Sequence, residues 1–147
     1  MKFINQNKHI LATNDRTTNL YGILRVNQAI IPIMRQQGSG RIILISSLAA
    51  EAGLPFQSVY CASKAALDIM IESLCMEIKA FGIDACVLQP GDFKTEVAQH
   101  RKHPKFDSES PYRKAFEEIN LNATNKVNVA EDPLKVARKA SQLLKKE

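Results

Sequence analysis

The chain has 147 residues, of which 45% are hydrophobic, and this is enough for one domain with a buried core. Its formal net charge of +5 comes from dispersed lysines and arginines without an aromatic-interleaved basic stripe, which argues against nucleic-acid and membrane-surface binding. No apolar run approaches the length of a transmembrane helix, so no membrane span is expected.

The cysteines and the first residues indicate a compartment. Cys61, Cys75 and Cys86 are odd in number and none belongs to a CxxC pair. Residues 1–11 lack the long apolar region of a signal peptide. We therefore expect a reduced, cytoplasmic protein.

The first half of the chain alternates between helical and extended patterns. Residues 1–15 are polar and predict a poorly ordered segment, followed by one domain over 16–147. Residues 16–37 carry apolar side chains near helical spacing, and glycine at position 38 ends that pattern. The short apolar run at 41–45 predicts a strand buried on both faces, as in parallel sheets.

The second half continues the alternation. Residues 59–81 predict a long helix whose apolar residues cover more than one stripe, which indicates two burial surfaces. Gly82 ends it, and 84–89 predict the next strand, so the strand, helix and strand predict an α/β fold with a parallel sheet. Helices are expected over 112–121 and from 132 onward.

A set of polar residues suits proton transfer. Tyr60 and Lys64 are four positions apart and therefore share one helix face, where an ammonium favours the ionised form of a neighbouring phenol. Ser47 follows the predicted strand, at the carboxyl edge where α/β sheets bind ligands. The alternatives are that Ser47 caps a turn and that Lys64 is a solvated helix lysine.

Four segments resemble the successive motifs of the short-chain dehydrogenase/reductase family, in that family's order and spacing. They are Asn19-Leu-Tyr-Gly22, Gly38-Ser-Gly-Arg41 continuing to Ser47, Tyr60-x-x-x-Lys64 and Pro90-Gly-Asp-Phe-Lys-Thr95. The resemblance implies the C-terminal, catalytic portion of a Rossmann-like doubly wound parallel sheet. It also implies an NAD(P)-dependent oxidoreductase that interconverts an alcohol and a ketone or aldehyde.

The resemblance assigns catalytic roles to four residues. Tyr60 would transfer the proton, Lys64 would tune it and bind the cofactor ribose, and Ser47 would orient the substrate oxygen. Asn19 would hold a water in a proton relay, although by itself it is an ordinary polar residue at a helix start.

Further along the chain, the resemblance places cofactor contacts and a lid. Pro90 and Gly91 would bend beneath the nicotinamide, Thr95 would bind its carboxamide, and residues 97–124 would form the variable lid over a small-molecule substrate. The residue that selects NAD or NADP in the family has no counterpart here, so either nucleotide is possible. Family members commonly form homo-oligomers through the helices matching 16–37 and 59–81.

The glycine-rich turn that binds the cofactor pyrophosphate is missing, since none of the six glycines forms GxGxxG. We expect a partial fold that lacks the N-terminal glycine-rich βαβ units, with an unpaired edge on the strand 41–45 and marginal stability unless another subunit covers it. The alternative function is a catalytically silent remnant or a dimerisation module.

Metal and thiol chemistry are not expected. His100 and His103 are one helical turn apart, but no third-ligand pattern accompanies them. Cys61 has no histidine in a recognisable relation and is predicted to pack within the helix.

Overall fold

The computed structural model describes residues 15–96, 106–107 and 109–145. The helices and strands of these residues, in chain order, are η1 (Asp15–Gly22, π-helical), α2 (Ile23–Gln37), β1 (Gly40–Ile45), η2 (Leu48–Ala50, 3₁₀), α3 (Ser58–Ile78), η3 (Lys79–Phe81, 3₁₀), β2 (Ile83–Leu88), α5 (Arg113–Asn128) and α6 (Leu134–Leu144).

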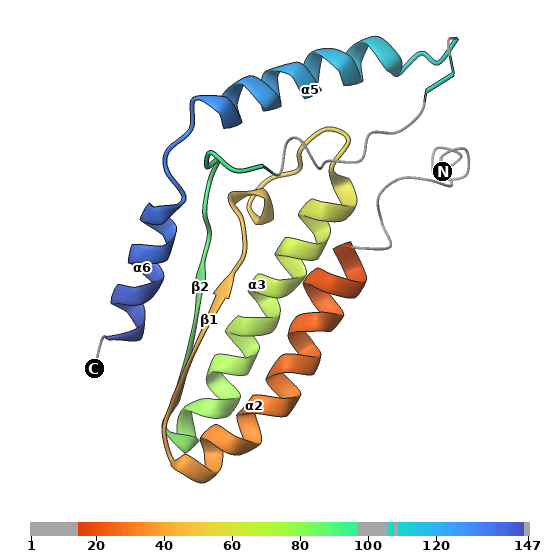
Figure 1. Ribbon diagram of the computed structural model, residues 1–147. Helices are drawn as coiled ribbons and strands as arrows, with labels where there is room; N and C mark the ends of the chain where they lie inside the picture. The colour runs from red at the N-terminus through yellow and green to blue at the C-terminus, as the bar shows by residue number, and fades with distance from the viewer. Residues whose placement is uncertain (1–14, 97–105, 108, 146–147) are drawn as a thin grey trace.

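The strands β1 and β2 lie side by side in a parallel two-stranded sheet, with a register running from the pair Gly40 and Ile83 to the pair Ile45 and Leu88. Helices α2 and α3 lie on one face of this sheet, α6 lies on the other, and α5 crosses beyond the carboxyl ends of the strands (Figure 1). The predicted α/β class, with two parallel strands joined through a helix, is confirmed.

The core forms between α3 and the sheet. Leu67, Ile71 and Ile78 recur at helical spacing on α3, are buried, and pack with Ile42 and Leu44 of β1. The β-branched isoleucines favour the extended conformation of β1, and Ile42 and Leu44 fill the space beneath α3. This packing fixes the start of α3 relative to the ends of the strands.

Two glycines end the helices that flank the sheet. Gly38 follows α2 with φ of 69°, and Gly82 follows η3 with φ of 72°. Residues with a side chain rarely adopt this left-handed backbone conformation, so glycine suits both positions. A Cβ at Gly82 would lie 2.3 Å from the carbonyl oxygen of Gly38, because the two turns are in contact. The predicted helix stops are confirmed.

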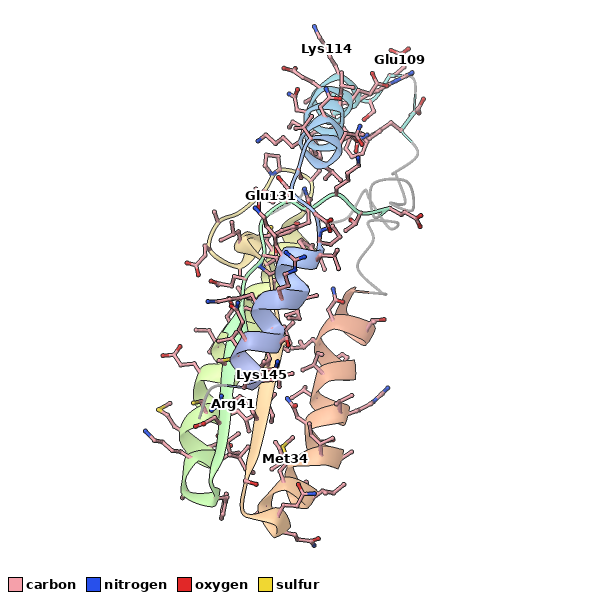
Figure 2. The ribbon with its side chains drawn as sticks, turned by 60° about the vertical axis from the view of Figure 1, so that its left-hand side comes forward. Met34, Arg41, Glu109, Lys114, Glu131 and Lys145 are labelled. Atoms are coloured by element: carbon pink, nitrogen blue, oxygen red, sulfur yellow. The ribbon has the colours of Figure 1, made fainter. Side chains whose placement is uncertain are left out.

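The burial of β1 differs from the prediction. Ile42 and Leu44 are buried under α3, but Ile45, whose side chain projects to the opposite face, is 44% exposed. Among the described helices, α6 is the one that lies on that face, and it is held near the beginning of β1 (Figure 1). There Arg41 Nη1 donates to the Leu143 carbonyl oxygen at 2.8 Å, beside the end of α6 (Figure 2). The prediction of a strand buried on both faces was therefore wrong.

The last two helices are joined to the sheet by backbone contacts. Lys94 N donates to the Glu131 carbonyl oxygen at 2.9 Å, which ties the segment after β2 to the connection between α5 and α6. Asp132 Oδ1 accepts from Leu134 N at 2.8 Å and so caps α6. The helix predicted over 112–121 continues to Asn128 as α5.

On the outer side of α5, Glu117 accepts a hydrogen bond from Arg113 at 2.9 Å. That bond, reinforced by the carboxylate charge, raises the pKa of the Arg113 guanidinium above its ordinary value. The Arg113 guanidinium therefore keeps its positive charge beside Glu117.

Parts of two predictions lie outside the described residues. The poorly ordered segment 1–15 is outside them except for Asp15, which begins η1, and residues 97–105 and 108 of the predicted lid are outside them as well. Among the helices that the structure describes, none combines the length and the apolar character needed to cross a membrane.

Candidate functional site at the carboxyl ends of the strands

The ends of β1 and β2 stay in contact beyond the sheet. Ser46 N donates to the Leu88 carbonyl oxygen at 2.9 Å, and Leu48 N donates to the Pro90 carbonyl oxygen at 3.0 Å. These two bonds hold the residue between them, Ser47, beside the Pro90 turn. Sequence positions more than 40 apart therefore meet at one edge of the sheet, as the carboxyl ends of parallel strands do.

Ser47 caps the short helix η2. Its Oγ accepts a hydrogen bond from Ala49 N at 3.1 Å, so the structural role that the sequence left open is present. A serine hydroxyl has one hydrogen to donate and two lone pairs. The bond from Ala49 uses one lone pair, and Ser47 keeps the ability to donate to a substrate oxygen while it caps.

Lys64 lies between the end of β1 and Tyr60. Its Nζ donates to the Ile45 carbonyl oxygen at 3.2 Å and lies 5.9 Å from the centre of the Tyr60 ring. The start of α3 is attached to the strand from the other side as well, since Ser46 Oγ donates to the Lys64 carbonyl oxygen at 3.4 Å. The predicted neighbours on one helix face are thus also neighbours in space.

The Tyr60 hydroxyl makes no hydrogen bond to another side chain or backbone group in the described part of the chain. It is the backbone carbonyl oxygen of Tyr60 that accepts a side-chain hydrogen bond, from Ser63 Oγ at 2.8 Å. The phenol can therefore face a ligand.

An open cleft of about 1370 Å³ extends from this edge of the sheet toward α5 and α6. Its lining includes five of the predicted site residues, namely Ser47, Tyr60, Pro90, Gly91 and Thr95. The volume exceeds that of a typical pocket for one small ligand, so a substrate and part of a second molecule can fit together.

Two predicted site residues do not line this cleft. Lys64 instead contacts two residues that do line the cleft, Tyr60 and Ile45. Asn19 is half-buried in η1, and η1 packs against α3. A relay role for Asn19 stays a prediction.

Much of the apolar lining of the cleft was not predicted from the sequence. Four apolar residues of α5 at helical spacing and three of α6 line the cleft: Phe116, Ile119, Ala123, Val127, Val136, Ala137 and Ala140. The spacing on α5 was a usable signal for one apolar face, but nothing in the sequence alone indicated that α6 lies at the same cleft.

The residues present fit one end of a nicotinamide dinucleotide. The Tyr60 hydroxyl and the Lys64 ammonium offer the donors that ribose hydroxyls require, and Thr95 offers a hydroxyl for an amide. The pyrophosphate end does not fit, because Lys126 is the only cationic side chain among the described lining residues and Asp92 is also there.

Metal ligands cannot be assigned to this site. His100 and His103 lie outside the described residues. Within residues 15–96, 106–107 and 109–145, no group of three histidine, cysteine or acidic side chains is arranged to hold a metal ion.

A family model for short chain dehydrogenases matches residues 8–105 of the chain, which is well over half of it. The chain therefore belongs to the short-chain dehydrogenase family, and its α/β fold is a partial form of the family's Rossmann-like sheet.

Three known proteins show how far the similarity extends. A 3-ketodihydrosphingosine reductase of Bacteroides thetaiotaomicron is 40% identical over 84 residues, covering 57% of this chain and 31% of the reductase. A short-chain dehydrogenase from Streptomyces avermitilis has a TM-score of 0.67 at 32% identity, covering 88% of this chain and 46% of the other.

The third is a gluconate 5-dehydrogenase from Burkholderia cenocepacia, solved in complex with NADP and tartrate. It has a TM-score of 0.56 at 34% identity, covering 58% of this chain and 33% of the other. The chain thus spans less than half the length of each of these three proteins.

Proposed function

We propose that the protein is an NAD(P)-dependent oxidoreductase that interconverts an alcohol and a ketone or aldehyde. One observation carries the proposal: the hydroxyls of Ser47 and Tyr60 belong to residues lining the same cleft, and the Lys64 ammonium lies beside the Tyr60 ring. Two hydroxyl donors with an adjacent cation suit a carbonyl oxygen that gains negative charge as it is reduced.

In the direction of reduction, Tyr60 donates its proton to the carbonyl oxygen of the substrate, and Ser47 donates a hydrogen bond to the same oxygen. The nicotinamide cofactor, when bound, supplies the hydride. In the direction of oxidation, the Tyr60 phenolate accepts the alcohol proton. Lys64 stabilises that phenolate because its positive charge lies within about 6 Å of the ring, where cation and aromatic groups interact.

We assign the cofactor contacts to five residues. Tyr60 and Lys64 offer donors to the ribose, Pro90 and Gly91 lie under the nicotinamide ring, and Thr95 binds its carboxamide. Their meeting at the cleft supports this assignment, with Lys64 adjacent to it. Asn19 is proposed as a positioning residue that acts through Lys64, and the contact of η1 with α3 supports it.

The domain organisation is part of the proposal. Residues 16–147 form one catalytic domain in which 97–124 act as the lid, and the course of α5 across the carboxyl ends of the strands supports that role (Figure 1). We place the protein in the cytoplasm because Cys61, Cys75 and Cys86 are all unpaired thiols in the structure.

The substrate is proposed to be a small molecule with a carbonyl or secondary alcohol group. A similar protein is named as a 3-ketodihydrosphingosine reductase, and a similar structure was solved in complex with NADP. These names support the general chemistry for this chain. Either NAD or NADP is compatible with the site, because the assigned residues would contact the nicotinamide and its ribose, which both nucleotides share.

Calorimetric titration with NADH, NADPH and nicotinamide mononucleotide tests the cofactor assignment directly. We expect at least one dinucleotide to bind and the mononucleotide to compete with it, since the described residues contact the nicotinamide end. Lys64→Ala should weaken binding about tenfold or more, because a hydrogen bond to a charged group is lost. Lys114→Ala, on the exposed beginning of α5, is the matched control and should not change it.

The second candidate is a catalytically silent module that associates through its helices. It is favoured by large apolar side chains exposed on the helices, among them Val26 and Ile33 of α2 and Ile69 and Met76 of α3. Homo-oligomerisation through these helices is compatible with either function. Failure of both dinucleotides and of the mononucleotide to bind would leave this second candidate as the function of the chain.

A further inference from the structure

Phe56, which lines the cleft, has an unusual backbone conformation. Its φ is 60°, and among the described residues it is the one non-glycine residue with positive φ. A bulky aromatic residue in the left-handed region is a genuine outlier, and such strain persists only where its surroundings hold it. Phe56 comes four positions before Tyr60 and lines the same cleft.

The strained residue is held by its own loop. Gln57 N donates to the Leu54 carbonyl oxygen at 3.1 Å, closing a turn around Phe56. Leu54 N in turn donates to Cys61 Sγ at 3.4 Å, and Cys61 is buried in the first turn of α3. The loop that carries Phe56 is therefore tied to the first turn of α3, which also carries Tyr60.

Across the cleft, the Phe56 ring meets α5. Its centre lies 5.4 Å from that of Phe116 in an edge-to-face arrangement at 83°. Phe116 also stacks at a tilt on Phe106, at 5.1 Å. Phe56 and Phe116 both line the cleft, so the pair forms an aromatic wall in the cleft that Tyr60 also lines. Ile119, one turn further along α5, continues the wall.

We propose that Phe56 and Phe116 select the substrate, by holding the apolar body of a cyclic or long-chain ketone or alcohol while its oxygen faces Ser47 and Tyr60. This inference rests on the proposed function and names the substrate class for it. The wall is aromatic and aliphatic, and a small or charged substrate would leave it without a partner. The left-handed conformation of Phe56 is consistent with this role, since strained residues of this kind cluster at sites that hold ligands.

The test compares a bulky ketone, 2-decalone, with a small one, 2-butanone, using reduction rates and ligand-observed NMR binding on the full chain. Phe56→Gly is the main variant, because glycine removes the ring and also relieves the backbone strain, so the fold should be retained. Phe116→Ala is the second variant. Leu121→Ala is the matched control, because Leu121 of α5 is 60% exposed.

We expect Phe56→Gly and Phe116→Ala each to lower kcat/KM for 2-decalone about tenfold or more relative to 2-butanone, with Leu121→Ala unchanged. Equal values of that ratio in wild type and both variants would overturn the inference, and so would a wild-type chain that does not bind 2-decalone. If the wild type binds 2-decalone without reducing it and the two variants lose binding, the proposed reaction fails while the selection by Phe56 and Phe116 is upheld.

Discussion

Gly38 and Gly82 both adopt a left-handed backbone conformation, yet their surroundings differ. A Cβ at Gly38 would meet nothing within 4 Å, whereas a Cβ at Gly82 would lie 2.3 Å from the Gly38 carbonyl oxygen. Gly82 N donates to the Lys79 carbonyl oxygen, and its own carbonyl oxygen accepts from Gly40 N. Gly82 is thus needed both for its conformation and for the contact between two turns.

These surroundings give a matched pair of substitutions. Gly38→Ala should lower the free energy of unfolding by about 1 kcal/mol, from the left-handed conformation alone. Gly82→Ala should lower it by about 1–3 kcal/mol more, because the added methyl group also displaces backbone. Urea unfolding followed by circular dichroism measures both. Equal losses in the two variants would show that the turns are not in contact.

At the scale of elements, α3 has two different faces. Leu67 is 1% exposed against the sheet, whereas Ile69, two positions later, is 64% exposed on the opposite side. The first face fixes Tyr60 and Lys64 over the strand ends, and the second is available to another molecule.

Leu67→Ala should lower the free energy of unfolding by about 2–5 kcal/mol, because it removes buried methyl groups and leaves a cavity. Ile69→Ala should change it by less than about 0.5 kcal/mol in a monomeric sample, since the side chain is largely in water there. Thermal melting at low protein concentration checks both. A large loss for Ile69→Ala under those conditions would contradict the assigned orientation of α3.

The sequence was sufficient to predict elements whose signals are local. The apolar run at 41–45, the periodicity of 59–81 and the glycines at 38 and 82 predicted β1, α3 and both helix ends, because propensity and packing agree there. The incomplete cover of Ile45 could not be predicted, since it depends on where α6 lies.

Contacts between distant segments explain the rest of what was missed. The motif residues Ser47, Tyr60 and Pro90 were predicted to share a site and do line one cleft, because parallel strands bring their ends together. The contact of Phe56 with Phe116 joins residues 60 positions apart, and no periodic pattern encodes it.

At the scale of the whole molecule, the described sheet has two strands, and β1 pairs only with β2. An edge with unsatisfied backbone groups favours association with another chain. Together with the apolar side chains exposed on α2 and α3, this edge supports the expectation that the protein is stable only when another subunit covers it.

We therefore expect the melting temperature to rise with protein concentration, as it does when association stabilises the folded state. Ile69→Asp should weaken association, because a charge would be buried in the proposed interface. Glu72→Asp, at an exposed position on the same helix, is the control. Sedimentation velocity measures the states, and a monomer with a concentration-independent melt in the wild type would refute this expectation.

The central claim is that Tyr60 transfers the proton in an oxidoreductase cleft, and the most direct test is the rate of NADH- or NADPH-dependent ketone reduction by Tyr60→Phe. This substitution removes one hydroxyl that has no hydrogen-bond partner among the described residues, so the fold should be retained. We predict a fall in kcat of about 10²–10⁴-fold. Tyr112→Phe, at the exposed beginning of α5, should keep the wild-type rate. A Tyr60→Phe variant that reduces the ketone as fast as the wild type would contradict the claim.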